Sequence, residues 1–476
     1  MYRHARSLPC ARPLAFTARR VLVRAAMAAT VSLMVAAPAQ ADSLLDLLQS
    51  ARSYDAVYLA AKAQADSVQY RVEQAYALRR PSVGLQGAVT RSHLDSSVPP
   101  SSLTAALGQR TNNSNYTSRR VAVQVRQSLY NGQDAAQIEQ AERSLEVAMT
   151  DLETAESDLI VRVTQAYFDV LAAQDVLATT QANKKALAEQ LAAARRSFEV
   201  GNATITDTRE AQARHDLASA QEIAATNDLQ VKRIALDQLV GRTNVQPDPL
   251  ATPASLESLG TGTVDEWVEH SARAPLVRKA QLGLEVARLE IDKARAGHLP
   301  AVAATASVAQ TEVDAASSFV RTSMGAGTSA TMGVEVNVPL FAGFATQNRV
   351  KEALALQERS ERDLDNARRS VSLATRQAYT GVMSGLAQVK AYEAAEASAK
   401  LALEATQLGY RVGVRINKDV LDAQTALANT QKDLYKARYD VIVGSVRLRQ
   451  AAGTLQTEAL ADLNRQLFPT GAPAPR

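Results

Sequence analysis

Two acids near the end of the sequence, Asp419 and Asp422, have a spacing that could serve a shared chemical role. They stand three positions apart, so both side chains lie on one face if this segment is helical. Several copies of the chain around one axis would then hold a ring of carboxylates, which attracts and selects cations. The alternative is that acids in a first helical turn stabilise the positive end of the helix.

Asp207 stands 419 − 207 = 212 positions before Asp419, in a similar segment. The run Thr204-Ile205-Thr206-Asp207 is a variant of the capping box, in which the first and fourth residues close the start of a helix. Ile416 stands where Thr204 would be repeated, so capping explains Asp419 poorly. For Asp207 two interpretations stay open, a helix cap and a closing contact between helices.

Patterns of catalysis and metal binding are absent from the sequence. His93, His215, His270 and His298 are scattered without a metal-ligand spacing, and no GxxxxGK[ST] phosphate loop occurs. The sequence therefore predicts that the protein is not an enzyme and that it has no catalytic residue, no metal site and no cofactor.

The first 41 residues have the organisation of an export signal. They combine six arginines and no acid with an apolar stretch from Ala25 to Ala37, and they end in the small-residue run Ala39-Gln40-Ala41. The stretch is too short for a membrane-spanning helix, which needs about twenty residues. We expect cleavage before Asp42, which removes the only cysteine, Cys10, and with it any cysteine that could carry a lipid.

The rest of the chain is nearly neutral. Without the six arginines of the leader, 53 − 6 = 47 basic residues face 49 acidic ones, and aromatic residues make up only 4% of the sequence. Nucleic-acid binding depends on a basic surface and on rings that stack with bases. The composition thus predicts no nucleic-acid partner.

The chain contains a domain-sized duplication. Gln165-Ala166-Tyr167 recurs as Gln377-Ala378-Tyr379, and Val200-Gly201 recurs as Val412-Gly413, each 212 positions later (377 − 165 and 412 − 200). The predicted organisation is a signal peptide at 1–41, a first repeat of helix, two strands, long helix and helix at 42–245, a linker at 246–263, a second repeat at 264–453 and a C-terminal tail at 454–476.

Each repeat contains one very long helix. After Gly132 no proline or glycine occurs until Phe198 has passed, and Ala, Leu, Glu and Gln predominate. A helix of about 66 residues (198 − 132) would be about 100 Å long. The segment from Gly343 to Tyr410 repeats the design and is interrupted internally only by Gly381, Gly385 and Gly409. Gly201 and Gly413 mark the helix breaks. Such helices need neighbours that cover their apolar stripes.

Alternating apolar and polar residues predict four β-strands of about ten residues. The apolar series run through Val83, Leu85 and Val89, through Val121, Val123, Val125 and Leu129, through Val302, Ala304, Ala306 and Val308, and through Val334, Val336, Val338 and Leu340. Strands of this length cross a bilayer when tilted, and the polar alternate face suits a water-filled lumen. Tyr130 and Phe341 stand at equivalent strand ends, where membrane-interface aromatics belong.

Four strands cannot close a wide barrel by themselves. Either they form an amphipathic sheet on a soluble domain, or several chains pool their strands into one barrel. The export signal and the two strand-end aromatics favour the barrel.

The duplicated layout resembles the TolC-type trimeric outer-membrane channels of efflux and type I secretion. The resemblance is carried by Phe198-Glu199-Val200-Gly201, by Tyr410-Arg411-Val412-Gly413 and by Asp419-Val420-Leu421-Asp422-Ala423, and it covers nearly all of the chain after the leader. It implies an α+β membrane protein. Three protomers of four strands each would form one 12-stranded transmembrane β-barrel, continued by a long periplasmic α-helical barrel.

The resemblance also implies a gate at the periplasmic end. The family's closing contacts fall on Asp207, Tyr410 and Arg415, its acidic aperture ring falls on Asp419 and Asp422, and helices around Gly201 and Gly413 shift to open the tunnel. Asn417 and Lys418 depart from the hydrophobic residues expected between Arg415 and Asp419, which affects the charge expected at the aperture.

The function implied is that of a passive exit duct in the outer membrane of a Gram-negative type of cell, extending into the periplasm. Its partners would be outer-membrane lipid, a periplasmic adaptor (membrane fusion) protein, an inner-membrane ABC or proton-driven transporter and the exported substrate. The missing lipid-bearing cysteine and the acidic pair favour type I secretion of a toxin-like protein. The alternatives are a multidrug or small-molecule efflux channel and, in another class, a soluble periplasmic coiled-coil adaptor.

Overall fold

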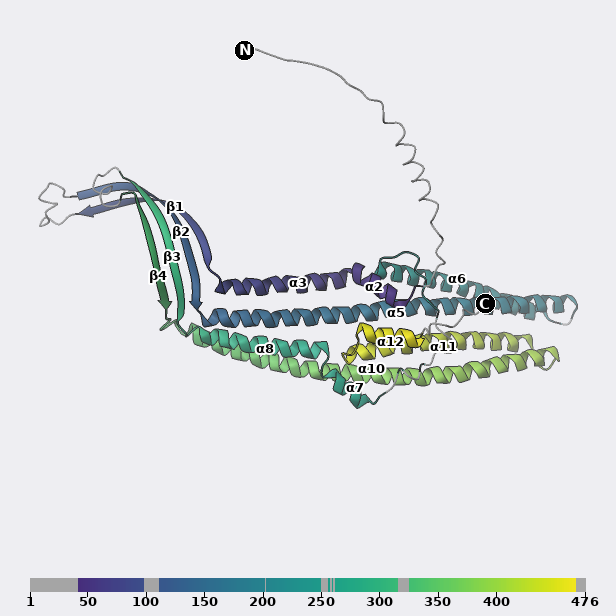
Figure 1. Cartoon of the computed structure of the whole chain (residues 1–476). Helices are drawn as coiled ribbons and strands as arrows, with labels where there is room; N and C mark the ends of the chain where they lie inside the picture. Colours follow the sequence, from purple (N-terminus) through teal and green to yellow (C-terminus); the bar gives the residue numbers. More distant parts are fainter. Residues whose placement is uncertain are drawn as a thin grey trace, which may run out of the picture.

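The computed structural model describes residues 42–97, 111–201, 203–249, 256, 259, 262–315 and 325–467. The predicted signal peptide, part of the linker and the last residues of the tail lie outside this part. Figure 1 shows an elongated molecule with a curved sheet at one end and long helices beyond it. The elements are α2 (Leu44–Tyr54), α3 (Ala56–Tyr76), η1 (Ala77–Arg79), β1 (Ser82–Ser97), β2 (Thr111–Tyr130), α5 (Gly132–Glu199), α6 (Ile205–Val240), α7 (Val264–Ser271), α8 (Pro275–Ala296), β3 (Ala301–Ala315), β4 (Gly327–Asn337), α10 (Ala345–Arg411), α11 (Asn417–Ala451) and α12 (Thr457–Leu467).

The sheet has the order β1-β2-β3-β4, with antiparallel neighbours throughout. Leu85 lies opposite Val123, which lies opposite Val308. Directly opposed residues share a face, so the predicted apolar series form one continuous apolar face. This face is uncovered within one chain, as the 73% exposure of Leu85 and the 89% exposure of Met332 show. In the described residues, the outer edges of β1 and β4 have no strand neighbour.

The opposite face of the sheet is polar. Nη1 of Arg126 on β2 lies 3.0 Å from Oε2 of Glu335 on β4, so this ion pair reaches across β3. The predicted alternation of an apolar and a polar face is therefore confirmed.

The strands differ from the prediction in length and in one boundary. Strands β1 to β4 contain 16, 20, 15 and 11 residues. β1 and β2 are longer than predicted because their backbone pairing continues through the polar segment at the start of β2, where Thr111 lies opposite Ser97. Tyr130 ends β2, but β4 ends at Asn337. The prediction that Phe341 stands at a strand end is therefore wrong. The strand stops before Pro339, because proline has no backbone N–H to donate to a neighbouring strand. Phe341 instead packs edge to face on Phe344, with ring centroids 5.4 Å apart.

The two predicted long helices are confirmed: α5 runs through the segment without proline or glycine, and α10 continues through Gly381, Gly385 and Gly409. Helix α5 has 68 residues and α10 has 67. Below the sheet, α3, α5, α8 and α10 lie side by side, because α5 contacts α3 and α8, and α8 contacts α10. At the far end, α5 pairs with α6, α10 pairs with α11, and α11 also packs on α5. We call this far end, formed by the turns after α5 and α10, the hairpin end.

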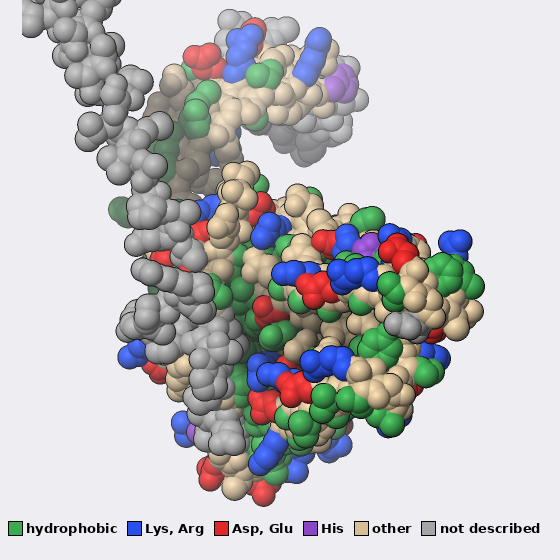
Figure 2. Space-filling view, turned by 90° about the vertical axis from the view of Figure 1, so that its right-hand side faces the viewer, with side chains coloured by type: hydrophobic (Ala, Val, Ile, Leu, Met, Phe, Trp, Pro, Cys, Tyr) green, Lys and Arg blue, Asp and Glu red, His purple; other side chains and the backbone are tan. Residues whose placement is uncertain are grey.

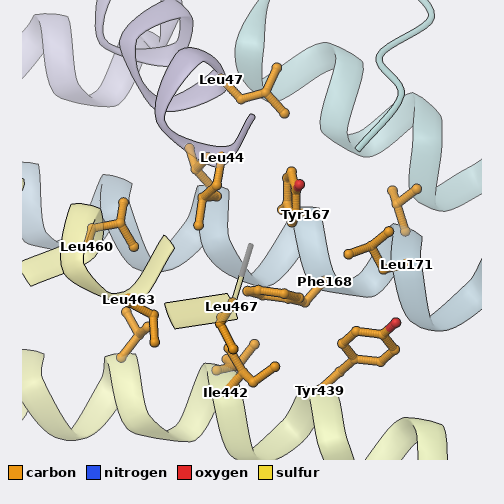
Figure 3. Close-up of a cluster of buried hydrophobic side chains, with 14 of the residues drawn as sticks. Leu44, Leu47, Tyr167, Phe168, Leu171, Tyr439, Ile442, Leu460, Leu463 and Leu467 are labelled. Atoms are coloured by element: carbon orange, nitrogen blue, oxygen red, sulfur yellow. The ribbon is translucent and has the colours of Figure 1, made fainter. Parts of the chain in front are cut away.

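A hydrophobic core holds the middle of the molecule together (Figure 3). Tyr167 and Phe168 of α5 pack edge to face with centroids 5.3 Å apart, and Phe168 lies 5.8 Å from Tyr439 of α11. Leucines of α2 and α12 cover these rings, including Leu44, Leu47, Leu460, Leu463 and Leu467. The predicted tail thus contains a packed helix. Among the described helices, none combines the length and apolar character needed to cross a membrane.

Candidate functional site

Two glycines end the long helices at the hairpin end. Gly201 has a φ of 80° and Gly413 a φ of 82°, and this left-handed conformation favours glycine because it has no Cβ. The N–H of Gly201 donates to the carbonyl of Phe198, and that of Gly413 donates to Tyr410. Figure 2 looks onto this end, where basic and acidic side chains gather beside hydrophobic ones.

The two helices that leave these turns begin differently. At the start of α6, Thr204 Oγ1 accepts the N–H of Asp207 at 3.2 Å, and Asp207 Oδ2 accepts the N–H of Thr204 at 3.0 Å. This is a complete capping box. At the start of α11, Ile416 occupies the N-cap position and makes no side-chain cap.

The three residues expected to close a gate are not joined within one chain. In the described residues, Arg415 forms its ion pair with Asp419, at 3.6 Å, and none with Asp207. The stem of Arg415 lies on Gly409, where an added methyl group would approach Cγ of Arg415 to 2.8 Å. Tyr410 is half-buried in the last turn of α10. Any bond between Arg415 and Asp207 therefore requires a second protomer or a different state.

Asp422 holds the densest charge contacts at this end. Its Oδ1 lies 2.6 Å from Nη2 of Arg214 on α6, and its Oδ2 lies 2.5 Å from Nζ of Lys418 on α11. The hydrogen bond from Lys418 lowers the pKa of the Asp422 carboxyl and raises the pKa of the Lys418 ammonium, against the opposing effect of burial on each. Asp422 is therefore ionised and paired at neutral pH.

Asn417 and Leu421 fasten the first turns of α11 to the neighbouring hairpin. Asn417 is only 3% exposed, and its Oδ1 accepts a hydrogen bond from Nε2 of Gln190 on α5 at 2.5 Å. Its Nδ2 is buried and has no hydrogen-bond partner among the described residues. Leu421 is fully buried in a cluster with Leu187, Leu191, Ala194, Ala211 and Ala218. Both side chains place the start of α11 against α5 and α6.

Arg214 and Gln190 were not among the residues expected from the sequence. Arg214 stands seven positions after Asp207 (214 − 207), so helical periodicity could have placed it on the same face. Gln190 carries no comparable signal, because its partner Asn417 lies 227 positions away. The described residues contain no group of three or more His, Cys, Asp or Glu side chains that could hold a metal ion.

The sequence matches the family model described as outer membrane efflux protein, over residues 47–242 and 268–454. The outer membrane protein TolC of Vibrio cholerae is 31% identical over 428 residues, which cover 90% of this chain and 94% of that protein. The proteases secretion protein PrtF of Dickeya chrysanthemi is 29% identical and covers 89% of this chain and 91% of its own length.

Solved structures share the fold. A crystal structure of CusC superposes with a TM-score of 0.73 at 17% identity, covering 87% of this chain and 92% of CusC. The outer membrane protein VceC from Vibrio cholerae has a TM-score of 0.69 at 18% identity, covering 86% of this chain and 96% of VceC.

These likenesses confirm the predicted fold class, an α+β protomer that gives four strands to an outer-membrane barrel and long helices to a periplasmic tunnel. They also confirm the predicted location in the outer membrane, extending into the periplasm, and the general function of an efflux or secretion channel. The chain belongs to the family of outer membrane efflux proteins.

Proposed function

We propose that the chain is the outer-membrane exit duct of a type I secretion system and works as a homotrimer. The observation that carries the proposal is the four-stranded sheet joined to helices of 68 and 67 residues. Its apolar face is uncovered, and its two edges have no strand neighbour among the described residues. An exposed apolar face next to open edges is unfavourable in water. Pairing β4 of one protomer with β1 of the next removes the edges, and lipid covers the face.

The hairpin end is the gate in this proposal. Asp207, Tyr410 and Arg415 form the closing contacts, Asp419 and Asp422 line the aperture, and Gly201 and Gly413 are the points around which the helices shift. Tyr130 and Phe341 lie near the membrane interface. Their exposures of 50% and 73% leave both rings free to meet lipid headgroups.

Two relatives named as protease secretion proteins support a protein cargo, and the outer membrane efflux protein BepC of Brucella suis, 28% identical over 72% of this chain, supports the small-molecule alternative. PrtF is a proteases secretion protein, and the alkaline protease secretion protein AprF of Pseudomonas aeruginosa is 33% identical over 66% of this chain. The probable efflux pump outer membrane protein TtgC of Pseudomonas putida is 26% identical over 69% of this chain. Multidrug or small-molecule efflux is the alternative. A periplasmic adaptor and an inner-membrane ABC or proton-driven transporter supply the energy and the opening signal, and the duct itself has no enzymatic activity.

Mass measurement of the purified mature protein tests the assembly. We expect three protomers in a detergent-dependent particle, extracted from the outer-membrane fraction, that forms ion channels in planar bilayers. A stable monomer without detergent would instead identify a soluble coiled-coil adaptor.

Deletion of the gene tests the cargo. We expect one or more proteins to disappear from the culture medium, and the transporter that copurifies with the duct to be of the ABC type. Increased sensitivity to small toxic compounds with an unchanged set of secreted proteins would support efflux.

A further inference from the structure

The start of α11 is held by other helices and not by its own cap. Ile416 makes no side-chain cap, whereas Thr204 closes a capping box at the equivalent place in α6. Three side chains in the first two turns of α11 replace the cap, Asn417, Leu421 and Asp422. The position of this segment therefore depends on contacts with α5 and α6.

The two acids of the segment are bound differently. Asp422 accepts hydrogen bonds from Arg214 and from Lys418. In the described residues, the Asp419 carboxylate accepts no side-chain hydrogen bond. Its ion-pair partner is Arg415, whose Nη1 lies 3.6 Å from Oδ2 of Asp419 and whose side chain is 62% exposed. Charge-assisted hydrogen bonds at short distance neutralise a carboxylate and fix its orientation. A longer, exposed ion pair such as that of Asp419 neutralises and orients the carboxylate much less.

We propose that Asp422 is a clasp that fastens α11 to α6 through Arg214, while Asp419 alone supplies the acidic charge of the aperture. The proposal rests on the channel function above and divides the roles of two residues that the sequence treats as one pair. Lys418 has a part in this division, because it neutralises Asp422 from within α11 and contacts Oδ2, which leaves Oδ1 for Arg214 of α6.

Asn417 both stabilises and destabilises the contact between α11 and α5. Its buried Nδ2 has no hydrogen-bond partner in the part of the chain that the structure describes, and an unpaired buried donor is unfavourable. Movement of α11 away from α5 would expose this donor to water and relieve that penalty. The Arg214 contact then adds to the contacts of Gln190 and Leu421 that hold the segment, and the unpaired donor offsets part of their stabilisation.

Single-channel recording from the purified protein in planar bilayers, under a KCl gradient, tests the clasp. We expect Asp422→Asn and Arg214→Gln each to raise the conductance several-fold, and the double variant to conduct no more than either alone, since both remove one contact. Asp419→Asn should mainly shift the reversal potential toward lower cation preference. Glu222→Gln is the matched control, because it breaks an ion pair with Lys184 that joins α5 to α6 without touching α11.

Charge reversal separates the clasp from general damage to the fold. In a Lys418→Gln background, where no ammonium repels a new arginine at position 422, Arg214→Glu combined with Asp422→Arg should return the conductance toward that of the Lys418→Gln protein, while each reversal alone should open the channel. Asp422→Asn that shifts the reversal potential as Asp419→Asn does, at native conductance, would overturn the proposal. Failure of the native protein to form any channel would instead overturn the proposed function, and that result comes before any variant is measured.

Discussion

Asp207 and Asp419 occupy the same third position in two equivalent helices, yet only Asp207 accepts the backbone N–H of its own N-cap residue. The difference arises one turn earlier, where Thr204 in α6 is matched by Ile416 in α11. The two repeats therefore share the acid and differ in the cap. This separates the two hairpins into one that closes its own helix start and one that relies on its neighbours.

Removal of the intact cap tests how Asp207 acts. Thr204→Ala takes away the hydroxyl that accepts the Asp207 N–H, which should destabilise α6 by about 1 kcal/mol and lower the melting temperature of the helical circular-dichroism signal. Asp207→Ala should have the same effect if Asp207 is only a cap. If Asp207 also closes the gate with a neighbouring protomer, Asp207→Ala should raise conductance where Thr204→Ala does not.

Installation of the missing cap is the converse test. Ile416→Thr recreates the Thr-x-x-Asp pattern at the start of α11 and should stabilise it by about 1 kcal/mol. We expect a higher melting temperature and fewer spontaneous openings in bilayer recordings. Ile416→Val is the control, because valine matches threonine in shape and has no hydroxyl. Equal behaviour of the two variants would mean that no cap forms.

Arg415 should hold the closed state of the trimer. Arg415→Ser removes a guanidinium that is exposed within one protomer and therefore available to another. If Arg415 pairs with an acid on the neighbouring protomer, as the proposed gate requires, its removal leaves that acid without a partner and the conductance should rise several-fold. Arg411→Ser is the control, since Arg411 is exposed on the last turn of the same helix. Unchanged conductance in Arg415→Ser would remove Arg415 from the gate.

The contact between Asp175 of α5 and Tyr439 of α11 predicts a pH dependence. Burial raises the pKa of the Asp175 carboxyl, while the Tyr439 hydroxyl, which donates to it at 2.6 Å, lowers that pKa. Because the folded pKa lies above the unfolded one, the stability contributed by Asp175 is complete when it is protonated and is lost as pH rises through the folded pKa. The part of the stability that Asp175 contributes should therefore fall as pH rises from the ordinary carboxyl range through the raised pKa.

Tyr439→Phe should make the protein's stability fall more steeply as pH rises. It leaves the ionised Asp175 without its donor, which should destabilise the protein by about 1–3 kcal/mol at neutral pH and by less in acid. Thermal melting in both buffers measures the difference. Tyr435→Phe is the control, because Tyr435 is partly buried against the same core without bonding to Asp175 in the described residues. A uniform loss at both pH values would contradict the assignment.

Much of the fold follows from local sequence signals. The absence of proline and glycine between Gly132 and Gly201 predicts α5 nearly to the residue, because only these residues interrupt a helix strongly. The alternation around Val123 predicts the faces of the sheet. The length of β2 could not be predicted, since the residues from Thr111 to Ser118 pair through their backbone and show no apolar period.

The site was less predictable because its contacts join distant helices. Helical spacing shows that Asp419 and Asp422 share a face, and the Thr-x-x-Asp pattern indicates the cap at Asp207. These local patterns cannot show which cationic side chain of another helix contacts Asp422, because Arg214 lies 208 positions away in the sequence. The rotation of α11 against α6 decides that contact, and this depends on the burial of Leu421.

The register of the sheet also constrains the order in which it can be built. β1 pairs with β2 and β3 pairs with β4 across short stretches of chain, but Val123 of β2 meets Val308 of β3 across 308 − 123 = 185 positions. Closing so long a loop costs more chain entropy than closing a hairpin, and contacts distant in sequence form slowly. We therefore expect the β1–β2 and β3–β4 hairpins to form first. The central pairing of β2 with β3 should form last, after α5 and α8 have packed. Pulsed hydrogen exchange during refolding would show this as late protection of β3 amides that face β2. Early protection there would indicate that the central pairing forms first.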